Sequence, residues 1–302
     1  MDLKSKIILI YGPTASGKSI FAIKLAKKIG GEIINADSMQ VYKELKILSA
    51  RPIKKNQKTI KHHLYGFQNV KKNFSTGHWL KLVNKKIKEI RKSGKVPILV
   101  GGTGLYFKAL TDGLVKFPNI PLKFREKVRS LQKKLGPNNF FLKLIKEDPL
   151  IKNYINPSDT QRSIRAYEVK LFTNKSIYEW FKNTKSEYEK DEFYKIYIDY
   201  PRSELLLRIR KRVQEMIKNG AIREVKKFIN LNISQKKSVN KAIGIFEIKE
   251  FIDKKIQISE VIEKISVKTR QYAKRQSTWA RGNMQDWNKI TPNGLNKFLK
   301  KV

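Results

Sequence analysis

The sequence has no cysteine among its 302 residues and only three histidines, His62, His63 and His78. The absence of cysteine excludes disulfide bridges, structural zinc bound by thiolates and catalysis by a thiol. The histidines lack the spacing of a metal site, so we predict structural or surface roles for them. No stretch approaches the about 20 apolar residues of a membrane helix, and the first apolar run, 7–10, is too short for the core of a signal peptide. We therefore expect a soluble, cytoplasmic protein with no membrane attachment.

Acidic residues are also scarce. The chain has 26 Asp and Glu against 66 Lys and Arg, a formal net charge of +40. A chain this basic repels itself unless a polyanion binds to it. The excess is spread through every segment, however, and scattered surface lysines need have no partner. The charge therefore permits RNA or DNA binding without establishing it. The hydrophobic content of 40% is that of a globular protein, and the length suits one large domain or two modest ones.

The N-terminal third alternates between strand and helix patterns. Apolar runs predict strands at residues 6–11, 32–36 and 96–100, and helical spacing predicts helices at 19–28 and 75–92. Nearly unbroken apolar strands separated by helices are typical of a parallel sheet covered on both faces.

The pattern changes between about Pro118 and Asp191, where strand signals vanish. Four helices are predicted there, at 122–135, 138–147, 158–172 and 177–183, and Ser158 with Gln161 fits a capping box at the start of the third. A strand at 194–198 and helices at 203–219, 243–253 and 259–281 follow. We predict an α/β fold in which residues 1–117 and 193–302 form the core, mainly helical in its C-terminal part, and residues 118–192 form an all-helical insertion.

A complete P-loop lies between the first predicted strand and helix, and its residues are Gly12, Pro13, Thr14, Ala15, Ser16, Gly17, Lys18 and Ser19. Its backbone amides and the N-terminus of the helix point at one spot, which predicts that a phosphate chain binds there. Lys18 adds positive charge for the terminal phosphates, and the hydroxyl of Ser19 is placed to bind Mg²⁺. The core is therefore expected to be a P-loop NTPase-like parallel sheet, although the loop alone does not decide which phosphate compound binds.

Two further polar residues follow predicted strands. Asp37 ends the second strand and Thr103 follows the third, so both should lie beside the P-loop at the carboxyl edge of the sheet. Position alone leaves another role open for each, as a helix cap or turn residue for Asp37 and as a turn hydroxyl for Thr103. The third strand ends in glycines rather than in the carboxylate that nucleotide hydrolases use to hold Mg²⁺. This favours diphosphate as a leaving group over hydrolysis.

Several blocks of the sequence together resemble one family, the tRNA dimethylallyltransferases, also called tRNA isopentenyltransferases. The matching segments are the P-loop and residues 36–43, 99–110, 159–168, 206–220 and 269–279, so the resemblance spans about residues 6–287. It implies a Mg²⁺-dependent transfer of a dimethylallyl group from dimethylallyl diphosphate to N6 of the adenosine 3′ to the anticodon of tRNA.

The family pattern also implies roles for single residues. Asp37 would take or bias the proton of the weakly nucleophilic N6. The charge that grows on the departing diphosphate would be stabilised by the P-loop amides, Lys18, Thr103 and Mg²⁺ at Ser19, and Arg212 would clamp the diphosphate. Without the resemblance, Arg212 would be taken for a solvated or ion-paired helix residue.

The partners implied by the resemblance are dimethylallyl diphosphate and the anticodon stem-loop of tRNA, with the protein acting as a monomer. The residues expected to meet tRNA are Asp37, Ser38, Met39, Gln40, Thr103, Arg125, Gln161, Arg162, Ser163, Ile164, Arg165, Lys241, Arg270 and Lys274. Loop-borne, unstacked bases are what proteins read in RNA, so the target adenosine is expected to be extruded into the site.

Spacing alone favours simpler roles for some of these residues. Arg165 and Glu168 would pair on a solvated helix surface. In the last predicted helix, Arg270 and Lys274 belong to a basic side suited to phosphates. Tyr272, Gln276 and Trp279 form a neighbouring stripe that, taken alone, indicates core packing.

The sequence departs from the family pattern at residues 44–52, 62–67 and 245–246, which puts tRNA contacts there in doubt. Two other functions remain open: a P-loop kinase for a small metabolite, and a non-enzymatic RNA-binding protein with a vestigial P-loop. The missing strand-end carboxylate and the basic insertion argue against the kinase. The intact Lys18, Ser19 and Asp37 argue against an inactive loop.

Overall fold

The computed structural model describes residues 3–52, 59–182, 184–235 and 237–302. They form two compact units: unit 1 contains the residues up to Thr111 and from Tyr188 onward, and unit 2 is Asp112–Glu187. Both borders lie a few residues before the predicted ones. Phe117 packs on Trp180 and Phe181 inside unit 2, whereas Tyr188 packs on Phe193 inside unit 1.

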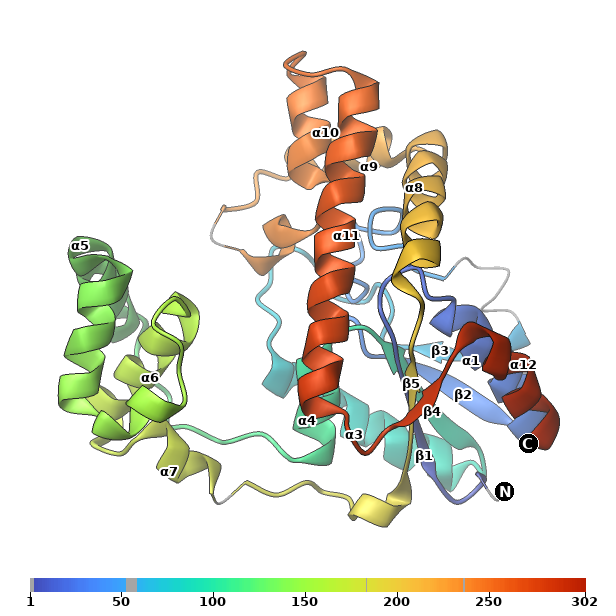
Figure 1. Ribbon diagram of the computed structural model, residues 1–302, viewed down its shortest axis with the longest axis horizontal. Helices are drawn as coiled ribbons and strands as arrows, with labels where there is room; N and C mark the ends of the chain where they lie inside the picture. Colours follow the sequence, from blue (N-terminus) through green and yellow to red (C-terminus); the bar gives the residue numbers. More distant parts are fainter. Residues whose placement is uncertain (1–2, 53–58, 183, 236) are drawn as a thin grey trace. The chain divides into compact units, whose positions relative to one another are not determined.

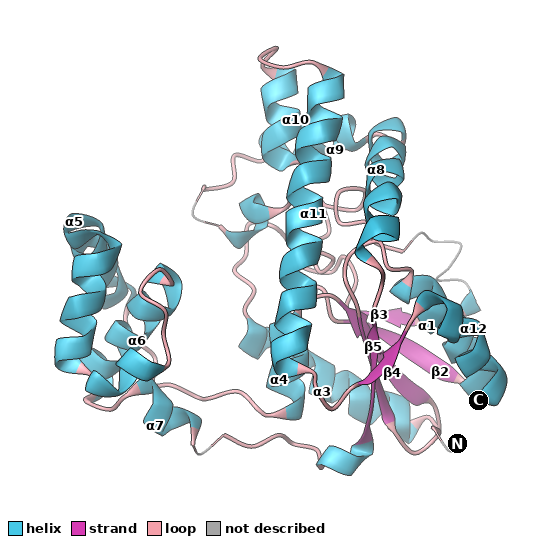
Figure 2. Ribbon diagram, in the orientation of Figure 1, coloured by secondary structure: helices cyan, strands magenta, loops and turns pink. Residues whose placement is uncertain are grey.

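Unit 1 is built on a six-stranded sheet with the order β3-β2-β4-β1-β5-β6, in which all neighbouring strands are parallel. Figure 2 shows the strands of this sheet in magenta. The strands are β1 (Ile7–Tyr11), β2 (Gly31–Asn35), β3 (His62–His63), β4 (Val96–Gly101), β5 (Phe193–Ile198) and β6 (Asn288–Ile290). Every residue of β1, β2 and β4 is buried, as expected for strands covered on both faces. The four predicted strands are confirmed, and the short edge strands β3 and β6 add to them.

Helices cover both faces of this sheet (Figure 1). Those of unit 1 are α1 (Lys18–Ile29), α3 (Thr76–Lys92), α4 (Gly104–Thr111), α8 (Arg202–Lys218), α9 (Ala221–Ile229), α10 (Ile245–Ile252), α11 (Ile258–Asn283) and α12 (Pro292–Lys301). Alternate residues of β1 point to opposite faces. Leu9 packs in a core with Trp79 of α3 and Phe107 of α4, and Ile8 packs in a second core with Leu25 of α1. Helices α8 to α11 enclose a third core with residues 41–48.

Unit 2 contains only helices and loops among its described residues. They are α5 (Leu122–Glu147), α6 (Thr160–Thr173) and α7 (Ile177–Phe181), and short 3-10 turns lie at Pro149–Asn153 here and at Lys190–Glu192 and Ser238–Lys241 in unit 1. A kink at Gly136 (φ 74°, ψ 170°), followed by Pro137, divides α5 into the two predicted helices. The all-helical character of the insertion was thus correct; Asn183, the predicted end of its last helix, lies outside the described residues.

The predicted capping box at Ser158 was wrong. Helix α6 begins one residue later than that box requires, and its N-cap is Asp159, whose carboxylate accepts a hydrogen bond from the backbone N–H of Arg162. The hydroxyl of Ser158 instead contacts Oδ1 of Asn156 at 2.7 Å. Gln161 is therefore the second residue of the helix and does not reach back to the cap.

Candidate active site

The P-loop joins the end of β1 to the start of α1, as predicted. It turns through two left-handed residues, Ala15 (φ 64°) and Gly17 (φ 83°), the second of which precedes the first residue of α1. The ammonium group of Lys18 folds back and donates to the carbonyl of Pro13 at 3.1 Å. Gly12 has almost no free space, since an added Cβ would lie 2.9 Å from Oγ of Ser16. The loop is therefore compact, and the free amides of the first turn of α1 are available to an anion.

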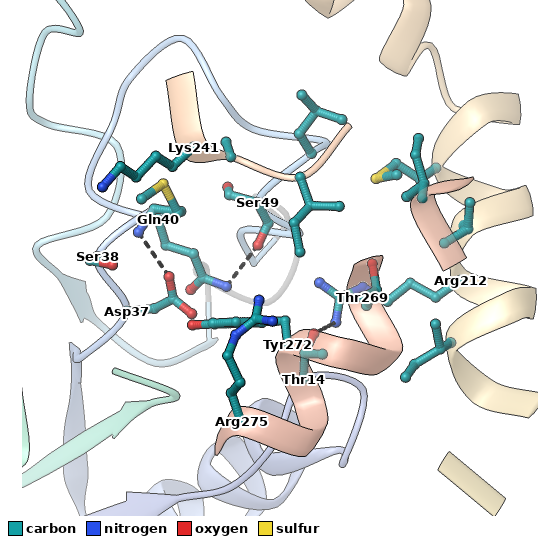
Figure 3. Close-up of a pocket in the computed structure, with 18 of the residues that line it drawn as sticks. Thr14, Asp37, Ser38, Gln40, Ser49, Arg212, Lys241, Thr269, Tyr272 and Arg275 are labelled. Atoms are coloured by element: carbon teal, nitrogen blue, oxygen red, sulfur yellow. Dashed lines mark hydrogen bonds between the residues drawn. The ribbon is translucent and has the colours of Figure 1, made fainter. Parts of the chain in front are cut away.

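Asp37 lies in a tight turn immediately after β2. Oδ1 of Asn35 accepts from the backbone N–H of Asp37, and Oδ1 of Asp37 accepts from the backbone N–H of Met39, both at 2.9 Å. The turn role that the sequence left open is thus real. It occupies one carboxylate oxygen, and Figure 3 shows the carboxylate of Asp37 on the wall of a cavity.

Thr103 joins the ends of β2 and β4. Its hydroxyl oxygen accepts from the backbone N–H of Ser38 at 2.9 Å, and its hydroxyl hydrogen points to Oγ of Ser38 at 3.3 Å. Nearby, a Cβ added to Gly101 would lie 1.9 Å from the carbonyl oxygen of Ala36. The close approach of the two strand ends leaves no room for a carboxylate at Gly101, which explains the missing acidic residue.

A cavity of about 340 Å³ within unit 1 brings together eight of the predicted site residues: Thr14, Lys18, Asp37, Ser38, Met39, Gln40, Arg212 and Lys241. Thr103, predicted as a catalytic residue, is not part of its lining. The polar lining of the cavity is Lys18 together with ten residues labelled in Figure 3: Thr14, Asp37, Ser38, Gln40, Ser49, Arg212, Lys241, Thr269, Tyr272 and Arg275. Its apolar lining is Met39, Leu48, Ile209, Val213, Met216, Ala242, Ile243 and Ile265. Cations, one carboxylate and an apolar wall therefore face the same space.

Burial tunes the charged groups of this cavity. It lowers the pKa of Lys18 to about 8, an effect that Asp37 opposes and Arg212 reinforces. Burial also lowers the pKa of Arg212, which remains charged and donates from Nη1 to Oγ1 of Thr14 at 3.0 Å. The pKa of Tyr272 is raised, first by burial and then by Asp37, so its phenol stays neutral.

A second cavity, of about 470 Å³, also lies at the P-loop. It is lined by Ala15, Gly17, Lys18, Ser19, Ile20, Ala50, Arg208, Lys211, Arg212 and Glu215. Lys18 and Arg212 line both cavities. Four basic side chains against one carboxylate suit a doubly charged phosphate group. In the described part of the chain, no group of three or more His, Cys, Asp or Glu side chains could hold a metal ion.

The predicted tRNA residues fall into three groups. Asp37, Ser38, Met39, Gln40 and Lys241 line the first cavity; Thr103, just before α4, and Arg270 and Lys274, on α11, belong to unit 1 but lie outside that lining; and Arg125, Gln161, Arg162, Ser163, Ile164 and Arg165 belong to unit 2. Ser163 and Ile164 are buried in unit 2, so their side chains offer no surface to tRNA there.

Glu168 of α6 was expected on a solvated surface, and this was wrong. Its side chain is 1% exposed and lies among Arg165 (3.3 Å), Arg125 (3.4 Å) and Arg129 (3.8 Å). A buried carboxylate needs paired cations. Glu168 therefore fixes three arginines that project from α5 and α6, and their charges exceed its own.

The last long helix, α11, contributes more than the sequence indicated. Thr269, Tyr272 and Arg275 line the first cavity, and Gln276 is buried against the P-loop. The core role predicted for the stripe holds for Trp279, whose ring lies 5.9 Å from that of Tyr11, but not for Tyr272. Residues 269, 272 and 276 share one helix face, and that periodicity within the family-like segment was the available signal.

A parallel sheet with a P-loop at its carboxyl edge defines this protein as an α/β enzyme with a P-loop NTPase-like fold. The sequence model of the IPP transferase family matches residues 40–283. The tRNA dimethylallyltransferase of Pelagibacter ubique is 59% identical over 302 residues, covering 100% of this chain and 96% of that protein. That of Rickettsia massiliae is 44% identical over 95% of this chain and 79% of its own length. The chain therefore belongs to the IPP transferase family.

Solved structures agree with this assignment. The full-length tRNA isopentenylpyrophosphate transferase of Bacillus halodurans superimposes with a TM-score of 0.71 at 30% identity, covering 98% of this chain and 95% of that one. A eukaryotic dimethylallyltransferase acting on tRNA gives a TM-score of 0.80 at 28% identity, over 95% of this chain and 73% of that one. None of the helices in the described ranges combines the length and apolar content that crossing a membrane requires.

Proposed function

We propose that this chain transfers a dimethylallyl group from dimethylallyl diphosphate to N6 of the adenosine 3′ to the anticodon of tRNA, giving N6-isopentenyladenosine. The observation that carries the proposal is the single cavity in which Asp37, Lys18 and Arg212 meet beside an apolar wall. Family membership supplies the reaction class, and the geometry assigns parts of the reaction to these residues.

The donor fits the cationic and apolar sides of the site together. Lys18 and Arg212 would hold the diphosphate, because both line the two cavities at the P-loop, and the amides at the start of α1 would add to their attraction. The five-carbon allyl group would lie on the apolar wall formed by side chains of α8 and residues 242–243. As the C–O bond breaks, the electron pair leaves with the diphosphate, and the fixed cations stabilise its growing charge.

The acceptor nitrogen needs a base, and Asp37 is the carboxylate in the cavity lining. One oxygen is held by the N–H of Met39, which fixes the orientation of the group and leaves the other oxygen for a proton. As the N6–carbon bond forms, a proton passes from N6 to Asp37 and then to solvent. Donation by Thr103 to the diphosphate stays a prediction, since its hydroxyl hydrogen points to Ser38 here.

The residues present fit a Mg²⁺ ion that arrives with the diphosphate. Ser19 lines the second cavity with Lys18, and Mg²⁺ in phosphate sites takes few protein ligands, completing its shell with phosphate oxygens and water. Ser19 would hold the ion, whose bound charge would assist the departure of the diphosphate.

The tRNA partner matches the basic surfaces of both units. Lys241, Arg270 and Lys274 in unit 1 and the arginines around Glu168 in unit 2 would contact phosphates, while the target base enters the cavity at Asp37. We expect the protein to act as a monomer in the cytoplasm, which sedimentation of the pure protein and fractionation of cells would test.

Transfer of label from dimethylallyl diphosphate to unmodified tRNA tests the proposal. With Mg²⁺ we expect labelled N6-isopentenyladenosine, loss of transfer on adding a chelator, and no consumption of ATP. Phosphorylation of a small alcohol without RNA would instead establish a metabolite kinase. Tight tRNA binding with no transfer would leave an RNA-binding protein with an inactive loop.

A further inference from the structure

Gln276 of α11 is a buried residue whose side-chain amide and backbone carbonyl together bond to three separate places at the sheet edge. Its Oε1 accepts from the backbone N–H of Thr14 at 2.8 Å, and its Nε2 donates to the carbonyl of Gly102 at 2.8 Å. Its own backbone carbonyl accepts from the hydroxyl of Tyr11 at 2.9 Å. The residue is 4% exposed. The amide thus uses both its donor and its acceptor on backbone groups beside the diphosphate site.

The residues around Gln276 leave little room for any other arrangement. A Cβ added to Gly102 would lie 2.1 Å from Nε2 of Gln276, so a side chain at position 102 would displace the amide. The next residue but one, Gly104, is closed in the same way by Trp279, which a Cβ there would approach to 2.3 Å. Helix α11 therefore packs closely against Gly102 and Gly104, just after the end of β4, and these contacts fix its position there.

The contact with Thr14 connects Gln276 to the diphosphate clamp. Thr14 is held through its backbone by Gln276 and through its hydroxyl by Nη1 of Arg212. Arg212 in turn lines both cavities with Lys18. A shift of Thr14 would move the partner that orients the guanidinium, although Gln276 does not itself line either cavity.

We propose that Gln276 is a positioning residue for the diphosphate site: its amide locks the P-loop at Thr14 to the end of β4 at Gly102 and thereby sets the place of Arg212. The identity of the diphosphate ligand rests on the proposed function. Gln276 acts through Thr14 and Arg212 and does not take part in the chemistry. A polar residue that merely filled the core would affect stability without changing the affinity for diphosphate.

The test uses inorganic diphosphate, which the P-loop would bind whether or not the chain transfers a prenyl group. Gln276→Met keeps the length of the side chain but removes both hydrogen bonds. We expect its dissociation constant for diphosphate, measured by calorimetry with Mg²⁺, to rise about tenfold, while its affinity for tRNA stays within twofold. An unchanged dissociation constant in a folded Gln276→Met protein would overturn the proposal.

Gln276→Glu gives a second readout that a loss of stability alone would not produce. A protonated Glu can still accept from Thr14 and donate to Gly102, whereas an ionised Glu faces that carbonyl with a second negative oxygen. Burial raises the pKa of such a carboxyl, and neither Tyr11, whose pKa is raised by burial, nor Lys18, with a pKa of about 8, titrates much between pH 5.5 and 7.

The diphosphate affinity of Gln276→Glu, divided by that of the unchanged protein, should therefore recover several-fold as the pH falls from 7 to 5.5. Gln271→Glu, an exposed site on the same helix, carries the same charge change and should show no such recovery. A ratio for Gln276→Glu that is flat with pH would overturn the proposal even if Gln276→Met failed to fold. Should the unchanged protein bind diphosphate but transfer no prenyl group, only the proposed function would fail.

Discussion

The carboxylate of Asp37 has two duties, since one oxygen closes a turn at Met39 and the group also lines the cavity. We expect Asp37→Ala to lower turnover by ~10²-fold or more with little loss of tRNA affinity, because the proton acceptor is gone while the binding surface remains. Single-turnover transfer and filter binding measure the two quantities.

Asp37→Asn is the matched control for the turn. It keeps an oxygen for the N–H of Met39 but cannot take a proton at neutral pH. Turnover should therefore be as low as in Asp37→Ala. Recovery of activity in Asp37→Asn would make the turn, and not proton transfer, the reason that Asp37 is needed.

Lys18 should make the reaction rate fall at alkaline pH, giving the plot of rate against pH an alkaline limb. Its pKa, lowered by burial to about 8, leaves the ammonium charged below that pH and neutral above it. The charged form attracts diphosphate, so kcat/KM for the donor should fall as the pH rises through about 8, with a slope that approaches one proton. Lys18→Met should be much slower and lack this limb; the same limb in Lys18→Met would assign it to another group.

For single residues, the sequence predicted much of the site but not the hydrogen bonds and ion pairs that hold its side chains in place. The P-loop, Asp37 and Arg212 follow from local patterns and the family resemblance, and the structure brings Lys18 of the loop, Asp37 and Arg212 to one cavity. Gln276 lies far along the chain from Thr14, and nothing in its local sequence shows that its amide bonds to backbone groups. Glu168 was misassigned because a charged residue at helical spacing is usually exposed, whereas α5 brings arginines over it.

Among the elements, helix α9 holds residues 46–48, which lie in the first of the three segments where the sequence departs from the family pattern. The carboxylate of Glu224 accepts from the backbone N–H groups of Lys46 and Ile47, both at 2.8 Å, and of Leu48 at 2.9 Å. Leu48 and Ser49 then line the active cavity. One carboxylate therefore orders three successive amides of this segment.

Glu224→Ala should lower the free energy of unfolding by about 2 kcal/mol, because three amides lose a charged acceptor. It should also raise KM for the prenyl donor several-fold, since Leu48 is part of the apolar lining of the cavity. Urea denaturation and initial rates measure these effects. Glu215→Ala removes an exposed carboxylate from α8 and should change the free energy of unfolding by less than about 0.5 kcal/mol. It is a control for stability alone, because Glu215 lines the second cavity. Equal losses of stability in the two variants would refute the structural role of Glu224.

Periodicity located the long elements and missed the short ones. Strands β1, β2, β4 and β5 and helices α1, α3, α8 and α11 carry continuous apolar patterns, and each lies within three residues of its predicted bounds. The edge strands β3 and β6 are only two and three residues long, and α12 buries none of its side chains fully. Such elements exist because a neighbour is present, β2 or β5 for the strands and α1 for α12, which a local pattern does not contain.

For the molecule as a whole, the charge of +40 favours nonspecific attraction to any RNA, so specific tRNA recognition must be judged by salt dependence. Arg162→Gln with Arg165→Gln should weaken tRNA binding and lower the slope of log K against log salt by up to about 1.5. Glu168 keeps Arg125 and Arg129 as partners, so unit 2 should remain folded in this variant.

The same charge change on α1 provides the comparison. Lys24→Gln with Lys27→Gln removes two exposed cations from a helix of unit 1 with no predicted tRNA contact. Its slope should change by less than half as much. If both double variants lose the same amount of tRNA affinity and of salt slope, the arginines of unit 2 contribute only to the overall positive electrostatic field of the protein.

The strand order has a consequence for how a ribosome delivers this chain. Ile8 near the N-terminus pairs with Ile98 on one side and with Tyr194 on the other. Nearly two thirds of the polypeptide must therefore be synthesised before the oldest strand has both neighbours, and until then its hydrogen-bonding edge is open. The helices of unit 2 come from one contiguous stretch and can close first. A nascent chain halted just before β5 would thus carry a finished helical unit beside an unprotected sheet, which is the state that chaperones must shield.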